Sequence, residues 1–199
     1  MLSVPAGAAA QIAGLPTLQS PFATPQIAVG VNGALGDSQK IVGLAGAWTP
    51  PSGRVQVSGG VARIGRDERD AGYAAGARFY LPLKTLAGEA VALGVLVGAG
   101  AARADERTVV TAPIGASLGY RRTLGATRAF AVYAAPFYSY TGVRTPDASS
   151  FLFRFALGAD VVVLPRVGLT VGYEAGQEPT GSEPGLRSPV TGVGLSYAF

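Results

Sequence analysis

The sequence contains no histidine and no cysteine. The absence of histidine excludes Ser-His-Asp hydrolysis, histidine-ligated metal sites and proton transfer by an imidazole. The absence of cysteine excludes disulfides and thiol chemistry. We therefore expect a protein that is not an enzyme and that holds neither a cofactor nor a metal ion.

Charged residues are scarce as well. They make up 14% of the chain, whereas hydrophobic residues make up 48%, and an average soluble domain carries roughly 25% charge. The formal net charge of +4 comes from arginines scattered along the sequence rather than from a basic patch. We therefore expect no nucleic-acid partner.

Long hydrophobic runs are also missing. The best candidate, residues 90–102, is rich in glycine and shorter than the roughly 20 residues that a membrane helix needs. Only helices and closed barrels satisfy their backbone hydrogen bonds in lipid. A chain this apolar without a spanning helix is therefore either an unusually apolar soluble protein or a closed β-barrel.

What the sequence does contain is a pattern with a period of two. From Gln26 to Phe199, apolar residues alternate with small ones, in about ten segments of about ten residues, the length of a tilted strand that crosses a bilayer. The pattern predicts an all-β fold, a closed antiparallel up-and-down transmembrane β-barrel of about ten strands. Eight strands are the alternative, because the segments at residues 26–31 and 130–140 are the weakest. In the second of these both rows are apolar, and a bulge at Pro136 would switch them.

The row opposite the apolar one is mostly Gly, Ala and Ser, which is typical of a crowded barrel interior rather than of a water-facing sheet. An apolar row that faced inward would instead indicate a soluble ligand-binding β-barrel, a further alternative. The charges within the strands all lie on the small-residue row and form an expected interior charge cluster of Arg78, Arg154, Asp160 and Glu174.

The register of the strands suggests how these charges pair. If Val163 faces Val167 across a three-residue turn, Arg154 becomes the diagonal neighbour of Glu174, and we expect an ion pair between them. Asp160 lies deeper and needs its own cation, for which Arg78 is the candidate. The cluster is then either a set of ion pairs that neutralises a plugged lumen or a charged constriction in a narrow pore.

Aromatic residues lie near both ends of the expected strands, as in the two interfacial girdles of a membrane barrel. One band comprises Trp48, Phe79, Tyr120, Phe130, Tyr197 and Phe199, and the other comprises Tyr73, Tyr138, Tyr140, Phe151, Phe153 and Tyr173. Aromatics in a soluble β core would instead lie at mid-strand. The two bands therefore favour lipid as the surroundings of the apolar row.

The connections between the strands alternate in character. Short turns with few acids, such as residues 49–53 and 164–166, alternate with more polar connections such as residues 65–70, 103–108 and 177–188. Short turns at one end and longer loops at the other are the outer-membrane arrangement, which places both chain ends in the periplasm. The acids at 67–70 and 105–106 fit a divalent cation or, as we prefer, solvated charges that pair with Arg66, Arg69 and Arg103.

The first residues do not follow the alternating pattern. Ala8, Ala9 and Ala10 are typical of a signal cleavage site, but no basic segment precedes them. We interpret residues 1–25 as a signal-peptide remnant and N-terminal extension, and residues 26–199 as the barrel domain.

The last eight residues, 192–199, resemble the β-signal of bacterial outer-membrane proteins. Phe199 supplies the terminal aromatic residue, Tyr197 the second aromatic residue, and Gly194 the glycine. Gly192 departs from that pattern, in which a polar residue precedes the glycine. The resemblance is to the small outer-membrane barrel group that includes OmpA-like and OmpX-like domains. It implies the cell outer membrane of a Gram-negative bacterium, insertion by the barrel-assembly machinery, and contact with outer-membrane lipids and lipopolysaccharide.

Two functions fit these expectations. The first is a non-enzymatic structural or surface-interaction barrel with a largely plugged interior, whose extracellular loop partner the sequence does not identify. The second is a narrow, porin-like pore for ions or small solutes, with the interior charges at its constriction. The enzymatic outer-membrane barrels that we considered depend on a catalytic histidine, which this chain lacks.

Overall fold

A computed structural model describes residues 26–199 except for 37–38, 53–54, 66–70, 88–89, 105–106, 125–127, 145–147 and 178–188. The expected signal-peptide remnant at residues 1–25 lies outside the described residues. The strands are β1 (Gln26–Gly36), β2 (Gln39–Thr49), β3 (Gln56–Gly65), β4 (Ala71–Leu86), β5 (Val91–Ala104), β6 (Arg107–Leu124), β7 (Arg128–Arg144), β8 (Ala148–Leu164), β9 (Val167–Gly176) and β10 (Val190–Ala198). No helix among the described residues is long and apolar enough to cross a membrane.

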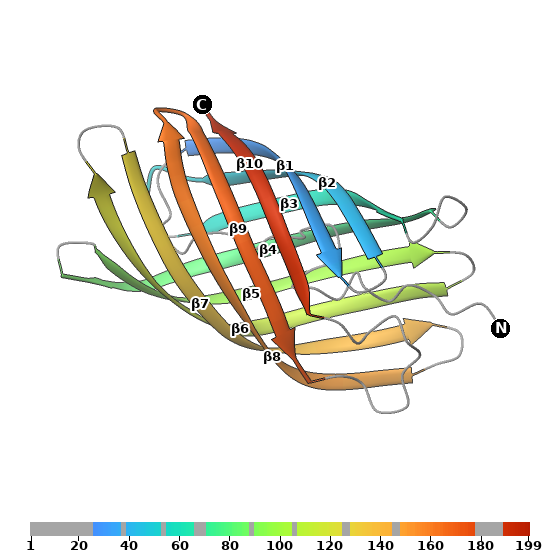
Figure 1. Cartoon of the computed structure of the whole chain (residues 1–199). Helices are drawn as coiled ribbons and strands as arrows, with labels where there is room; N and C mark the ends of the chain where they lie inside the picture. Colours follow the sequence, from blue (N-terminus) through green and yellow to red (C-terminus); the bar gives the residue numbers. More distant parts are fainter. Residues whose placement is uncertain are drawn as a thin grey trace.

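The ten strands form one closed sheet in which every neighbouring pair is antiparallel (Figure 1). Each strand pairs with the next along the chain, and β10 closes the sheet by pairing with β1. The closure continues past the last strand, because the backbone N–H of Phe199 donates to the carbonyl oxygen of Ile27 at 2.9 Å. The prediction of a ten-stranded up-and-down barrel is therefore confirmed, and the eight-stranded alternative is wrong.

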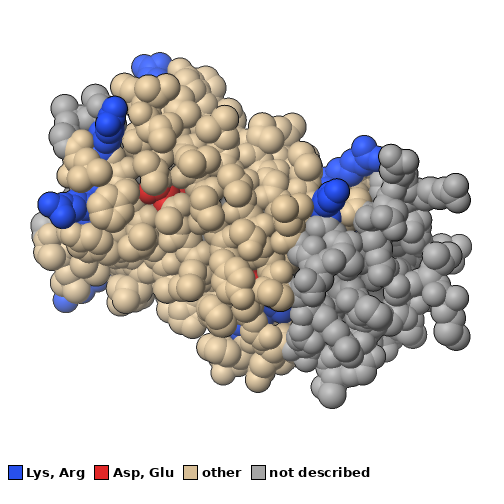
Figure 2. Space-filling model, in the orientation of Figure 1, with Lys and Arg blue, Asp and Glu red and all other residues tan. Residues whose placement is uncertain are grey.

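The alternation in the sequence separates the two faces of this sheet. The small-residue row points inward and is mostly buried, whereas the Val, Leu, Ile and aromatic row points outward, as in Leu44 and Leu118, whose side chains are exposed. On the face in Figure 2, lysines and arginines lie mostly at the two ends of the molecule, and the wall between them is largely uncharged. An outward apolar belt contradicts the soluble ligand-binding barrel and suits a wall that faces lipid.

The expected irregularity at Pro136 does not occur. β7 pairs with β8 without a register shift from Ala129 to Val143, and its alignment with β6 is the same on both sides of Pro136. Proline has no backbone N–H to donate to the hydrogen-bond ladder. Here it only interrupts the pairing of β7 with β6, and Pro136 itself stays on the outward row. The hypothesis that a bulge switches the two rows of β7 is therefore wrong.

Register shifts occur instead near two turns at the end of the barrel where β1 begins and β10 ends. One lies between Pro82 and Lys84 in β4, and the other lies between Val162 and Leu164 in β8. The second corrects the expected three-residue turn, because Leu164 pairs with Val167 and only residues 165–166 form the turn. The bulge at residue 163 takes up the difference, so the register further along β8 and β9 is the expected one.

The strands extend further into the polar connections than expected. Residues 37–38, 105–106 and 145–147 are all that separate the strands at three of the connections at the end opposite the start of β1. A longer connection at that end is residues 177–189, between β9 and β10. The expected contrast between short turns and long loops is therefore concentrated in this one connection.

Candidate functional site

The expected ion pair between Arg154 and Glu174 is present inside the barrel. Ala156 lies directly opposite Glu174 in the register of β8 and β9, which places Arg154 diagonally across from the carboxylate. The Nε atom of Arg154 lies 2.6 Å from Oε1 of Glu174, and the two side chains are only 5% and 1% exposed. A charge-assisted hydrogen bond at this length is strong, and neither partner can regain water if the other is lost.

The backbone around Gln177 holds this arginine in place. Gln177 donates its N–H to the carbonyl oxygen of Phe153 at 2.8 Å and accepts the N–H of Phe153 on its side-chain oxygen at 2.9 Å. Nη1 of Arg154 donates to the carbonyl oxygen of Gln177 at 3.3 Å. Gly176 makes this approach possible, since a Cβ there would lie 2.6 Å from the carbonyl oxygen of Phe153.

A second polar group surrounds Asp160. The hydroxyls of Thr170 and Tyr133 both donate to its Oδ1 atom, at 2.7 Å and 3.2 Å. Arg78, which is buried, interacts electrostatically with Asp160 and Tyr133. The structure therefore places the predicted interior charges in two groups, Arg154 with Glu174 and Arg78 with Asp160, each of which brings opposite charges together.

Two tyrosines that the sequence analysis did not single out fill the middle of the lumen. The ring of Tyr80 lies so close to Gly94 that no Cβ would fit there, and the ring of Tyr133 covers Gly158 in the same way. Both tyrosines are buried in a cluster with Leu96, Ala135, Phe137 and Ala156. The small inward residues thus make room for large ones on other strands.

The sequence contains a pattern that indicates the inward position of Tyr133. β7 has apolar residues on both rows, and one of those rows must face inward. The inward row carries Tyr133 and Phe137, opposite the glycines of β8 and β6. Large apolar side chains that face glycines on the neighbouring strands therefore indicate a filled lumen. A row of glycines considered alone instead favours an open lumen.

Burial differs between the two halves of the lumen. In the half away from the start of β1, the apolar residues Ala34, Ile41, Ala62, Ile64, Ala74, Ala102 and Val190 form a buried cluster. In the half where β1 begins and β10 ends, inward side chains such as those of Ala45, Thr170 and Ser196 are only half-buried, whereas those of Ser58 and Ala92 are buried. The lumen is therefore filled unevenly in the half where β1 begins.

The predicted girdle residues lie on the outer wall. All are exposed there except Phe130, which is half-buried. Tyr138 stacks on Phe151 with ring centroids 5.6 Å apart, and Tyr120 meets Phe130 edge-on at 6.4 Å. Trp48 and Tyr197 lie at strand ends, whereas Phe79 lies in the middle of β4, so the assignment of these residues to two aromatic belts stays a prediction.

The residues of the expected assembly signal lie on the closing strand and at its end. Gly194 faces inward opposite Asn32 of β1, whereas Tyr197 and Phe199 point outward with their rings 5.1 Å apart. The Tyr197 hydroxyl accepts a hydrogen bond from Arg166 in the β8–β9 turn, which raises the pKa of that guanidinium. The expected pairing of acids with Arg66 and Arg69 falls at 66–70 and 105–106, outside the described residues.

Solved structures with a similar fold are barrels of the bacterial outer membrane. The β domain of the Bordetella autotransporter BrkA is 14% identical, with a TM-score of 0.54 over 87% of this chain and 98% of that chain. A bacterial polysaccharide outer membrane secretin is 5% identical, with a TM-score of 0.52 over 81% of this chain and 57% of that chain. The N-terminal β-barrel domain of Pseudomonas aeruginosa OprF is 7% identical, with a TM-score of 0.43 over 88% of this chain and 98% of that chain.

No protein-family model matches the sequence, and no curated protein is significantly similar to it. At these identities the structural similarities concern the fold. That fold is a closed barrel of the bacterial outer-membrane type.

Proposed function

We propose that this chain is a non-enzymatic outer-membrane β-barrel protein with a structural or surface-interaction role and a largely plugged interior. The filling of the lumen is the observation that carries the proposal. Tyr80, Tyr133 and Phe137 occupy its middle, the Arg154–Glu174 pair is buried, and Arg78 is buried beside the half-buried Asp160. Interior side chains just fill an eight-stranded barrel, and a ten-stranded barrel is only slightly wider.

Single-channel recording in planar bilayers tests the plug. We expect no conductance steps from protein whose folding is verified by heat-modifiable migration on a denaturing gel. The variant Tyr80→Ala/Tyr133→Ala removes both rings from the middle of the lumen and is the matched control. It is expected to conduct, which would show that the barrel inserts under the same conditions.

A narrow pore is the second candidate. Half-buried inward residues in the half of the barrel where β1 begins and β10 ends, among them Asp160 and Thr170, favour it. Nη2 of Arg78 and the hydroxyl of Tyr80 are also buried without a hydrogen-bond partner among the described residues, and polar groups of this kind can hold water. Steady, ion-selective conductance steps from the unmodified protein, altered by Arg154→Ala, would overturn the plugged barrel and support this pore.

The proposed orientation places both chain ends in the periplasm. Because the chain has no cysteine, single cysteines can be introduced at Asp67, in the connection between β3 and β4, and at Ser52, in the turn between β2 and β3. We expect a maleimide too large to cross the outer membrane to label Asp67→Cys in intact cells and Ser52→Cys only after permeabilisation. The reverse pattern would overturn the orientation.

A further inference from the structure

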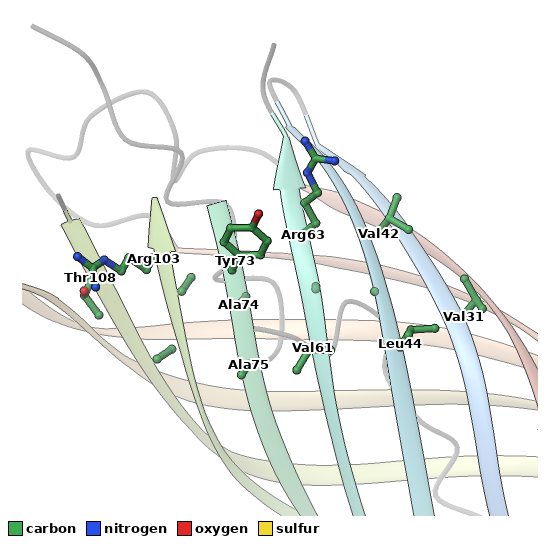
Figure 3. Close-up of a pocket in the computed structure, with 14 residues that line it drawn as sticks. Val31, Val42, Leu44, Val61, Arg63, Tyr73, Ala74, Ala75, Arg103 and Thr108 are labelled. Carbon is green, nitrogen blue, oxygen red and sulfur yellow. The ribbon is translucent and has the colours of Figure 1, made fainter. Parts of the chain in front are cut away.

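The outer wall of the barrel is hollowed near the strand ends opposite the start of β1 and the end of β10. A groove of about 780 Å³ runs over the outer face of β1 to β6 (Figure 3). Valines and leucines of β1 to β3 line one side of it, among them Leu44 and Val61, and Ala75 and Ala101 line the middle. Its volume is in the range of binding clefts for small molecules.

The groove exists because small side chains interrupt the belt of large ones. Val61, Ala75 and Ala101 are direct neighbours across β3, β4 and β5. The next outward level toward the middle of the barrel carries Gly59, Ala77 and Ala99 in the same register. An apolar groove open to the membrane can accept a hydrocarbon chain, because only dispersion contacts and close packing are needed there.

A polar row crosses the outer wall at the end of this groove, which corrects the expectation that all charges within the strands lie on the inward row. Arg63, Tyr73 and Arg103 are register partners on β3, β4 and β5, and Thr108 continues the row on β6. With strands spaced by about 4.8 Å, the two arginines start roughly 10 Å apart on either side of the tyrosine. Figure 3 shows Arg63, Tyr73 and Arg103 together at the strand ends.

Both arginines are exposed on the outer wall. Among the described residues, none forms an ion pair with either of them, and the acids that Arg103 is expected to pair with lie at 67–70 and 105–106, outside those residues. Arginine on a lipid-facing wall costs about 2–4 kcal/mol at the middle of the bilayer and little near its surface. The row therefore lies at the depth where a guanidinium can meet the headgroups of neighbouring lipids.

We propose that the groove and this row form a binding site for the phosphorylated, acylated glucosamine lipid of the outer leaflet, the lipid A part of lipopolysaccharide. An acyl chain would lie along Ala75 and Ala101, and Arg63 and Arg103 would bind phosphate oxygens through paired N–H donors. The Tyr73 hydroxyl adds a donor between them. The choice of the outer-leaflet lipid rests on the proposed orientation, since the row lies at the end opposite the start of β1 and the end of β10.

A second copy of the chain fits the groove less well. If two barrels met face to face through this groove, with their chain termini on the same side of the membrane, Arg63 and Arg103 of one would approach the same arginines of the other. Like charges so close at an interface are unfavourable. An anionic lipid instead complements both the charge of the row and the apolar surface beneath it.

The test measures lipid binding to the refolded full-length barrel in detergent by native mass spectrometry. The probes are bisphosphorylated lipid A and, separately, phosphatidylglycerol. Arg63→Gln/Arg103→Gln removes the row, and Arg122→Gln/Arg128→Gln is the matched control, because it removes the same charge from exposed positions at the opposite end. A third variant, Ala75→Leu/Ala101→Leu, fills the groove and keeps both arginines. Heat-modifiable migration verifies the folding of each variant.

We expect lipid A to bind the unmodified barrel and the control alike, and its affinity to fall at least about tenfold in the row variant and in the groove variant. Phosphatidylglycerol is expected to bind more weakly than lipid A. Equal loss in the row variant and the control, or no loss in the row variant, would overturn the site. Stronger binding of phosphatidylglycerol, lost with the row, would overturn the choice of lipid A. Because binding in detergent depends neither on orientation nor on conductance, its outcome is separate from the tests of the proposed function.

Discussion

Replacing Glu174 by leucine is expected to lower the free energy of unfolding by about 3–5 kcal/mol, the cost of removing one partner of a buried ion pair. The substitution leaves the Arg154 guanidinium without its carboxylate, 2.6 Å away in the native barrel. Its remaining bond to the carbonyl oxygen of Gln177, at 3.3 Å, does not neutralise the charge. Equilibrium unfolding in urea with lipid vesicles measures the change, followed by the fluorescence of Trp48, the single tryptophan of the chain.

The double variant Arg154→Met/Glu174→Leu is the control for this prediction. It removes both charges and keeps apolar volume, so most of the lost stability is expected to return. If Glu174→Leu alone unfolds at the same urea concentration as the unmodified barrel, the pair does not contribute to stability. A double variant as unstable as the single one would show that packing, rather than the unpaired charge, is responsible.

An arginine in the middle of the outer wall is expected to cost about 2–4 kcal/mol of stability in a bilayer. Leu157 is the site of choice, because it lies near the middle of β8, is exposed on the outer wall, and pairs with Ala134 and Tyr173 on the adjacent strands. In Leu157→Arg a guanidinium replaces an apolar side chain at the depth where it is farthest from water. The same unfolding measurement in vesicles gives the change in free energy.

Leu164 provides a control on the same strand. It is also exposed on the outside, but it lies at the end of β8, beside the turn at residues 165–166. Because the cost falls to about 0–1 kcal/mol near the interface, Leu164→Arg is expected to change stability little. If the two variants were equally stable, lipid would not surround the middle of the wall.

Much of the fold follows from the sequence because a barrel strand repeats every two residues. The alternation places Val29, Leu93 and Leu169 on the same face as every other outward residue, whatever the neighbouring strand is. The pairing of Arg154 with Glu174 follows as well, because a short turn determines which residues of two antiparallel strands face each other. The bulge at residue 163 shortens that turn without changing the pairing.

The inward positions of Tyr80 and Tyr133 were harder to infer. Each tyrosine packs over a glycine of a neighbouring strand, Gly94 and Gly158, and the space it needs depends on that strand rather than on its own. The alternation at Pro136 was ambiguous for the same reason, because both rows of β7 are apolar and only contacts with β6 and β8 decide between them.

The sequence by itself therefore determined that this chain forms a closed barrel with a largely apolar outer wall and with Arg78, Arg154, Asp160 and Glu174 inside, since those properties depend on periodicity and local pairing. Only the tertiary structure decided how the lumen is filled and where the outer wall is hollowed. Both depend on residues far apart in the chain, such as Arg63 and Arg103, which become neighbours of the same tyrosine when the sheet forms. The physical reason is that cavity shape and charge proximity arise from side-chain volumes on several strands at once.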